Sequence, residues 1–449
     1  MLEKLFKLNK RNTDIKTELL AGLTIFITMS YVMVAIPTIL SNIGLDAGAI
    51  FTANILALVI ATVFIAFFSN LPIVLAPSIS INIFMFVVIV KLLGYSWQFA
   101  LTAAIIQSVL FTLLVCLNLR EVLINVIPKN LIYAITCGLG FYMVFFVLTN
   151  MNSTSLSVNI ADLNQCTIQY FLYDKIGSFP IILCLIGVVI GAYLMEKKIK
   201  GSIIITVIIA TFIGIPMGLT RLPTDFTMFQ MPPSIRPIVC DFQLDGIISK
   251  DMIVVVSSLL FLNVFNVVGV LVGVTSKAGL LKRDDEHDKI RYALLSCSVG
   301  SIISSFIGVG SVTPYTESAS GVMEGGRTGL TALTAAALFA LSLFFYPIIA
   351  IIPKPVIIAA IVLTGIYMIK SIQYINFKDH TEAVPSLLLI IIMPLVFSIS
   401  EGIIVGILSY VILKILMGKA RQLDPVLILL ALLFCISLAF FGLNLNIIV

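Results

Sequence analysis

The sequence predicts an all-α polytopic membrane protein whose fourteen transmembrane segments form two inverted repeats of seven. Three observations carry this prediction. The 449-residue chain is 60% hydrophobic and only 11% charged, and its mean hydropathy of +1.16 lies far outside the range of soluble proteins. Apolar stretches of about 20 residues, long enough to cross a hydrocarbon core of about 30 Å, recur along the chain. Finally, two segments of the chain repeat one another.

The candidate spans fall into two sets. The first set covers roughly residues 19–41, 51–69, 80–93, 97–118, 126–149, 179–196 and 200–219. The second set covers roughly residues 250–276, 291–307, 315–325, 328–351, 353–371, 383–399 and 400–418. A further apolar run at about 425–443 either spans the membrane or lies along its surface, and both interpretations stay open.

The placement of Lys and Arg predicts the orientation of the spans. Basic residues gather in the N-terminal segment, around residues 197–200 and in the loop 277–291, which the alternating spans place on one side. The positive-inside rule makes that side cytoplasmic, so we expect a multi-pass protein of the plasma membrane with a cytoplasmic N-terminus. The segments 150–178 and 220–250 then lie outside. The net charge of +5 is modest and does not suggest a nucleic-acid partner.

The internal repeat is visible as two matching segments. "IPKNLIYAITCGLGFYM" from Ile127 and "IPKPVIIAAIVLTGIYM" from Ile352 share Ile, Pro, Lys, Ala, Gly, Tyr and Met at the same spacing, and each belongs to the fifth span of its set. Because seven is odd, two such sets enter the membrane with opposite orientation, as in the inverted repeats of many secondary transporters.

The third member of each set is unusual. "LPIVLAPSISINIFMF" and "GVGSVTPYTESASGVM" each contain a short extended run that ends at Pro77 or Pro314, followed by a helix too short to cross alone. Extended backbone at membrane depth needs hydrogen-bond partners, so we expect the two runs to pair as short β-strands. Ser78 and Thr316 are expected to cap the half-helices, whose N-termini would create a polar site in mid-membrane.

Glu317 is the candidate central residue. We expect it in the first turn of the second half-helix, where the helix dipole favours a carboxylate while burial penalises its charge. An ordinary helix-capping Glu is the alternative. Acids inside the membrane are energetically expensive and usually functional, which favours a role in function.

The motifs resemble a known family. "LAGLTIFITMSYV" from Leu20, "LAPSISINIF" from Leu75, "GYSWQFAL" from Gly94, "PYTESASGVMEGGRTGLTA" from Pro314 and "TEAVPSLLLIIIMPL" from Thr381 look like the nucleobase/ascorbate transporter (xanthine/uracil permease) family. The most similar branch is that of the AzgA-like adenine, guanine and hypoxanthine permeases. The resemblance covers residues from about 17 to 420.

The resemblance implies a division into a substrate-carrying core and a gate. The core would hold residues 19–118 and 250–351, and the gate residues 119–220 and 352–420. The remaining segments would be a cytoplasmic N-terminus (1–18), an extracellular loop (221–249) and an additional C-terminal hydrophobic segment (421–449). A homodimer through the gate helices is expected by resemblance alone.

The resemblance also implies substrate-binding residues. The family's helix-10 acid falls on Glu317, preceded by Tyr315 and Thr316, and its helix-3 polar positions fall on Ser80 and Asn82. The helix-8 acid of the purine branch is replaced in "VFNVVGVLVG" by Asn266. An amide can donate and accept hydrogen bonds but cannot take up or release a proton in the working range. Proton coupling is therefore expected through Glu317.

A flat purine base also needs apolar surface on its faces. Phe26, Phe84 and Tyr315 are candidate stacking partners, although a Phe in a membrane helix more often serves packing. Thr28 is a weaker polar candidate, because a Thr in mid-helix usually bonds its own backbone.

These features together predict a secondary active transporter that imports purine nucleobases by proton symport, with an elevator-type movement of the core against the gate. The alternatives are an uncoupled nucleobase facilitator, a related anion carrier and a substrate sensor that does not transport. No catalytic motif or metal-ligand spacing is present, so we expect neither an enzyme nor a cofactor, with protons as the coupling ion. Cys166 and Cys240 both lie in predicted external loops, and their pairing stays open.

Overall fold

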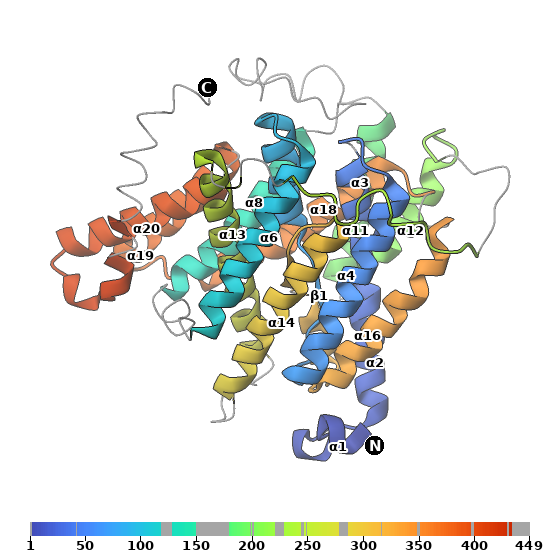
Figure 1. The fold of residues 1–449 in the computed structure, drawn as a ribbon, viewed down its shortest axis with the longest axis horizontal. Coiled ribbons are helices and arrows are strands. Elements are labelled where there is room, and N and C mark those ends of the chain that lie inside the picture. Colours follow the sequence, from blue (N-terminus) through green and yellow to red (C-terminus); the bar gives the residue numbers. More distant parts are fainter. Residues whose placement is uncertain are drawn as a thin grey trace.

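The computed structural model describes residues 2–41, 43–117, 128–149, 179–197, 199, 202–220, 229–243, 247, 249–277, 286–315, 317–347, 351–396, 399–428 and 431–432. Helices dominate, and two short strands interrupt them (Figure 1). The elements of the first half are α1 (Leu2–Phe6), α2 (Ile15–Met29), α3 (Val32–Ser41), α4 (Ala47–Phe68), β1 (Leu75–Pro77), α5 (Ile79–Ile83), α6 (Trp97–Cys116), α8 (Lys129–Thr149), α11 (Phe179–Glu196) and α12 (Ser202–Gly214).

The elements of the second half follow the same order of long helix, strand and short helix. They are α13 (Lys250–Lys277), α14 (Glu286–Ile307), β2 (Val312–Pro314), α15 (Ser318–Met323), α16 (Gly329–Ser342), α18 (Lys354–Ile369), α19 (His380–Leu395) and α20 (Ile399–Leu416). A π-helical stretch, η2 (Phe84–Leu92), continues α5. Short 3-10 segments are η1 (Asn9–Arg11), η4 (Leu343–Phe345), η5 (Lys370–Tyr374) and η6 (Ala420–Gln422).

Six helical stretches among the described residues are long and apolar enough to cross a membrane. They are Ile15–Ser41, Ala47–Phe68, Trp97–Cys116, Phe179–Glu196, Lys289–Ile307 and Lys354–Tyr374. Shorter apolar helices add Ile79–Lys91, Asn130–Phe145, Ser202–Gly214, Gly329–Phe345 and His380–Leu395. The chain is therefore a mostly helical, multi-pass membrane protein, as predicted. The count of fourteen spans stays a prediction, and most of the run at 425–443 lies outside the described residues.

The first span starts earlier than predicted and is broken in the middle. Its helix α2 begins at Ile15 rather than near residue 19, because the Asp14 side chain caps it by accepting a hydrogen bond from the Thr17 backbone N–H at 3.2 Å. The helix ends at Met29, and α3 restarts at Val32 after a turn at Ser30 and Tyr31.

Glu18, in the first turn of α2, is fully buried. Its carboxylate accepts hydrogen bonds from the backbone N–H groups of Arg327, Thr328 and Thr331, at 2.9, 3.3 and 3.1 Å. These groups surround the start of α16, where helical N–H groups lack partners within the helix. A carboxylate there also complements the helix dipole. Glu18 thus fastens α2 to α16.

The two strands pair with each other as predicted. β1 and β2 run antiparallel, with Leu75 opposite Pro314, Ala76 opposite Thr313 and Pro77 opposite Val312. Because residues 75–77 and 312–314 are 237 positions apart along the chain, this pairing joins the two halves at their centres. Neither segment forms an unbroken helix across the membrane, because each contains its strand.

A hydroxyl from a neighbouring helix holds each strand in the same way. Thr62 of α4 donates to the carbonyl of Leu75 at 2.9 Å and accepts from its N–H at 3.1 Å. Ser301 of α14 donates to the carbonyl of Val312 at 3.1 Å and accepts from its N–H at 3.0 Å. Buried backbone groups that have no second strand beside them are satisfied by these side chains.

The packing of the helices is also repeated. α4 packs on α16 while α14 packs on α6, and α8 packs on α19 while α18 packs on α11. In Figure 1, α4, α6 and α14 lie side by side at the centre. The matching repeat helices α8 and α18 cross at Gly140 and Gly365, where a Cβ on Gly140 would lie 2.6 Å from the Gly365 carbonyl oxygen. Equivalent residues meet each other here, as an inverted repeat predicts.

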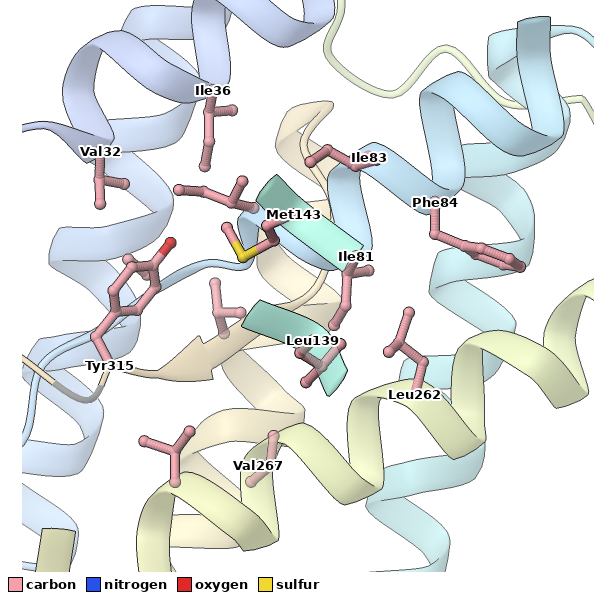
Figure 2. Packing of buried hydrophobic residues seen from close by; sticks show 14 of the residues in the cluster. Val32, Ile36, Ile81, Ile83, Phe84, Leu139, Met143, Leu262, Val267 and Tyr315 are labelled. Carbon is pink, nitrogen blue, oxygen red and sulfur yellow. The ribbon is translucent and has the colours of Figure 1, made fainter. Parts of the chain in front are cut away.

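The contacts divide the helices into two groups. One contains α2, α3, α4, α5, α6, α14, α15, α16 and the strands, and the other contains α8, α11, α12, α18, α19 and α20. α13 belongs to the first group and touches the second through α8 and α20. Figure 2 shows Leu139 and Met143 of α8 among buried side chains of the first group, such as Ile81 and Leu262. One face of α8 therefore covers the half-helix region.

Candidate functional site

The predicted central acid lies where β2 gives way to α15. Glu317 occupies the N-cap position of α15, one residue before the predicted first turn, and 9% of its surface is exposed. Its side chain makes no capping hydrogen bond. The Tyr31 hydroxyl donates instead to Glu317 Oε1 at 2.7 Å. The carboxylate is therefore engaged with a helix from the other repeat, and simple helix capping does not explain it.

Tyr31 was not among the predicted site residues. Its ring is buried, with 4% of the residue exposed, and it lies in the turn that separates α2 from α3. Ser30, beside it, turns its hydroxyl back to the carbonyl of Ile27 at 2.7 Å. The run "FITMSYVMVA" reads as continuous apolar helix, so only the Ser-Tyr pair in mid-span hinted at a polar function.

The second predicted polar group, Asn266 of α13, is held by two serines. Its amide nitrogen donates to the hydroxyls of Ser78 at 3.1 Å and Ser80 at 3.3 Å. The two hydroxyls are also hydrogen-bonded to each other at 3.0 Å. All three side chains are buried. Ser78 occupies the predicted N-cap position of α5, but its side chain makes no capping bond, because it faces Asn266 and Ser80 instead.

Asn82 supports the backbone of the site. Its amide nitrogen donates to the Ser78 carbonyl at 2.7 Å, and its oxygen accepts from the Gly310 N–H at 2.9 Å. A Cβ on Gly310 would lie 2.7 Å from that oxygen, so only glycine permits the approach. Asn82 thus links the first half-helix to the strand of the other repeat, and whether it also contacts substrate stays a prediction.

Tyr315 is anchored to the strands at both ends. Its backbone N–H donates to the Val74 carbonyl at 3.2 Å, and its hydroxyl donates to the Pro77 carbonyl at 2.8 Å. The ring is buried and lies near Met143 and Val32 in Figure 2. Thr316, the neighbouring predicted residue, lies outside the described residues.

The remaining candidates lie on α2 and at the start of η2. Thr28 bonds the carbonyls of Thr24 and Ile25, as expected of a helical Thr, and its hydroxyl also lies 3.1 Å from that of Ser320 in α15. The ring of Phe26 packs edge-on against Phe339 of α16, with centroids 4.9 Å apart. Phe84 is buried at the beginning of η2. A stacking role for either Phe stays a prediction.

One helix connects the acid and the amide: α13, which carries Asn266, packs against both α15 and α5. The carboxylate of Glu317 can accept hydrogen bonds, and the amide and hydroxyls of the Asn266 cluster can donate or accept them. The described residues contain no group of three His, Cys, Asp or Glu that could hold a metal ion. These polar groups suit a small polar ligand.

An acid directly after Thr381 at the start of a helix is typical of an N-terminal cap, but Glu382 has another role. The N-cap of α19 is Asp379, which accepts from the Thr381 N–H at 2.9 Å. Hydrogen bonds from Thr381 and from Lys419 hold the pKa of Asp379 well below its usual range. Glu382 lies one turn further on and pairs with Lys414 of α20 at 2.9 Å. This ion pair, in which the lysine is buried and the glutamate partly buried, fastens α19 to α20.

The chain is similar to known permeases over most of its length. A model described as "Permease family" matches residues 16–405. The adenine permease AdeP of Escherichia coli strain K12 is 33% identical over 98% of this chain and 96% of its own. The guanine/hypoxanthine permease PbuO of Bacillus subtilis strain 168 is 34% identical over 97% of this chain and 99% of its own.

A solved structure shares the fold. The transmembrane domain of a cyanobacterium bicarbonate transporter, BicA, superimposes with a TM-score of 0.63 at 16% identity, covering 87% of this chain and 97% of that one. At this identity the likeness concerns the fold alone. The family match confirms the resemblance seen in the motifs and the expectation that the chain is not an enzyme. The chain belongs to the Permease family of membrane transporters.

Proposed function

We propose that the protein imports the purine nucleobases adenine, guanine and hypoxanthine across the plasma membrane. The observation that carries this proposal is the pairing of the two broken segments, which sets the Glu317 acid and the Asn266 amide at the centre of one helix group. Relatives of the same length are named adenine permease and guanine/hypoxanthine permease.

The chemistry of the two residues suits an uncharged heterocycle. A purine carries N–H donors and ring-nitrogen or carbonyl acceptors on the edges of a flat apolar ring. An ionised Glu317 accepts hydrogen bonds from the donors, while the amide and hydroxyls of the other arm complement the second edge. Ser80, Asn82, Thr28 and the aromatic candidates complete the proposed site. A fixed negative charge beside the ligand disfavours anions such as bicarbonate, which argues against an anion carrier.

The proposed transport cycle is an elevator. The group around α2, α4, α6 and α13–α16 serves as the core and carries the substrate, while the group around α8, α11, α12 and α18–α20 serves as the gate. The support is that few helix pairs join the two groups, and that α8 presents an apolar face to the half-helices. An apolar face without fixed hydrogen bonds lets one group slide past the other. A homodimer through the gate helices would keep the two gates fixed relative to each other while each core moves.

Proton symport is the proposed coupling, with Glu317 as the coupling group. The acid is buried at the substrate site, so a change in its proton occupancy is directly linked to binding there.

Uptake of labelled bases tests the proposal. Cells that lack their own purine permeases would express the wild-type chain, with its amount in the membrane measured by immunoblot. We expect accumulation of adenine, guanine or hypoxanthine above the vector control, and collapse of that accumulation when an uncoupler dissipates the proton gradient. A chain that reaches the plasma membrane but moves none of the three bases would contradict the proposed function.

An uncoupled facilitator is the second candidate, and Asn266 favours it. The amide removes one of two acids that the purine branch is expected to have, which leaves Glu317 alone to respond to pH. A facilitator would equilibrate the bases without concentrating them, and the uncoupler would not change its rate. The same uptake assay therefore separates symport from facilitation.

A further inference from the structure

Ser78 forms part of the polar cluster that holds Asn266, and the direction of its hydrogen bonds determines what the amide can offer a ligand. Ser78, Ser80 and Asn266 come from two helices, α5 with its N-cap and α13. The three side chains make three hydrogen bonds among themselves, at 3.0, 3.1 and 3.3 Å. They behave as one unit.

Counting hydrogens shows why the amide nitrogen faces the serines. The two hydroxyls carry one hydrogen each, and one of these is used between Ser78 and Ser80. With the Asn266 NH₂ toward them, both amide hydrogens find an oxygen, which gives the cluster three bonds. With the carbonyl toward them, only one hydroxyl hydrogen is left to donate, which gives two bonds. The serines therefore select one of the two amide orientations.

The backbone of Ser78 prevents the cluster from relaxing. Its N–H donates to the Ser311 carbonyl of the other repeat at 3.0 Å, and its carbonyl accepts from Asn82 at 2.7 Å. Ser311 is itself held, because its hydroxyl donates to Gln107 at 2.9 Å. The backbone of Ser78 thus cannot shift away from Asn266 without breaking the hydrogen bond to Ser311 that joins the two repeats.

The amide oxygen is the atom that the cluster leaves open. Asn266 Oδ1 accepts no hydrogen bond from the described part of the chain, yet it is not among the buried side-chain atoms without a partner. Asn266 keeps 8% of its surface exposed. One serine hydrogen is left over after the three internal bonds, so the cluster still has an acceptor, Oδ1, and a donor to offer.

We propose that Ser78 is a positioning residue that fixes the Asn266 amide with its carbonyl toward the substrate and thereby determines which purine is preferred. The proposal rests on the proposed transport of nucleobases. Adenine and hypoxanthine present opposite patterns at adjacent positions: N1 accepts and the 6-amino group donates in adenine, while N1–H donates and the 6-oxo group accepts in hypoxanthine. An acceptor and a donor held in fixed places match only one of these two patterns. An amide that can rotate by half a turn matches both, because its oxygen and nitrogen exchange places.

The test is the ratio of half-saturation concentrations for adenine and hypoxanthine uptake. In the wild type we expect the two to differ by about tenfold or more, the effect of one mismatched buried hydrogen bond. Ser78→Ala removes one of the two acceptors that hold the amide, and we expect the ratio to fall to within about threefold. Ser80→Ala, which removes the longer bond, should reduce the ratio less.

Ser108→Ala is the matched control. Ser108 is equally buried in α6, but its hydroxyl donates only to the Ala104 carbonyl of its own helix, so the ratio should stay at the wild-type value. A wild-type ratio near one, or an unchanged ratio in Ser78→Ala, would overturn the inference. If Ser78→Ala fails to reach the membrane, Ser78→Gly decides, because it removes the same hydroxyl at an N-cap position where glycine is tolerated, and the same fall in the ratio is expected.

The outcome is separate from that of the proposed function. A wild type that transports neither base removes the nucleobase proposal before any ratio can be formed. A wild type that transports both, with a ratio that Ser78 does not affect, removes only the inference about Ser78.

Discussion

The two arms of the site, β1 with α5 and β2 with α15, share a backbone design and differ in chemistry. Each arm is a three-residue strand followed by a short helix, and each strand is held by a hydroxyl from the preceding helix. The β1 arm presents the neutral hydroxyls of Ser78 and Ser80, which hold the Asn266 amide of α13. The β2 arm presents Glu317 with the Tyr31 phenol.

This difference separates what the fold requires from what the ligand requires. The hydroxyl clamps occur in both arms because unpaired strand backbone at membrane depth needs partners in either half. The ionisable group occurs in one arm only. If the proposed function is right, charge and proton exchange belong to the β2 arm, and fixed hydrogen-bond polarity belongs to the β1 arm.

The largest effect is expected from making the β2 arm neutral. Glu317→Gln replaces the carboxyl group that accepts from the Tyr31 hydroxyl by a neutral amide that cannot exchange a proton. We expect the apparent affinity for purines to fall by about 100-fold, the effect of losing hydrogen bonds to a charged group. Competition uptake measures it. If the variant has the same half-saturation concentration as the wild type, the role of Glu317 is refuted.

Removing the strand clamps should affect stability instead of selectivity. Thr62→Val keeps the shape of the side chain but leaves the N–H and C=O of Leu75 without their partner, and Ser301→Ala does the same for Val312. We expect each to lower the free energy of unfolding in detergent by about 1–3 kcal/mol. If the two strands depend equally on their hydroxyls, the two variants will lose the same free energy of unfolding. A large loss in one variant alone would show that the backbone support of the two arms also differs.

The next largest effect is expected from removing the Tyr31 hydroxyl, which donates to the acid of the β2 arm. Tyr31→Phe removes the donor to Glu317 and should weaken purine binding about tenfold, by leaving the carboxylate less well positioned. Tyr315→Phe is a suitable comparison, since that hydroxyl donates to a neutral backbone carbonyl of Pro77. Half-saturation concentrations for both variants would be measured in parallel. If Tyr31→Phe and Tyr315→Phe lose the same apparent affinity, the charge of the group that accepts the hydrogen bond is unimportant.

A smaller effect should come from adding an acid to the β1 arm. Asn266→Asp introduces a group that can take up and release a proton, which the amide cannot do. We expect the rate of uptake to vary about threefold more steeply between pH 5 and pH 8 than in the wild type, following the ionisation of the added carboxyl. An unchanged pH profile would show that this position does not take part in coupling.

The smallest effect is expected far from both arms, at Asp379. Its pKa is lowered by hydrogen bonds from Thr381 and Lys419, so its contribution to stability is complete above its unfolded value of 3.8 and is lost as the pH falls. Asp379→Asn should lower the melting temperature slightly at pH 7, and the difference should shrink as the pH falls through 4. Thermal unfolding of the purified protein checks both points, and a difference that grows on acidification would contradict the assignment.

The comparison of arms also shows how far the sequence could be interpreted. The strands and half-helices were predictable because Pro77 and Pro314 interrupt apolar segments that are too short to cross. Glu317 and Asn266 were identifiable because polar groups are rare in such segments. These signals are local, so they survive without knowledge of the rest of the fold.

The partners of those residues were not predictable, because they depend on tertiary contacts. Tyr31 lies 286 positions from Glu317, and no pattern in α2 marks the turn that brings it there. Ser78 was expected to cap a helix, but a cluster with another helix offers its hydroxyl more bonds than the cap. Glu382 was likewise interpreted from its neighbours, although Lys414 determines its position.

The crossing at Gly140 and Gly365 limits how the sequences of the two halves can diverge from each other. These glycines hold equivalent places in the repeat, and each would direct a Cβ into the carbonyl of the other, at 2.6 and 2.8 Å. After a duplication, a residue away from such a crossing can diverge alone, as Ser80 and Glu317 illustrate, each three positions after the proline that ends its strand. A residue on the crossing meets its own copy, so a methyl group gained by one half displaces the backbone of both.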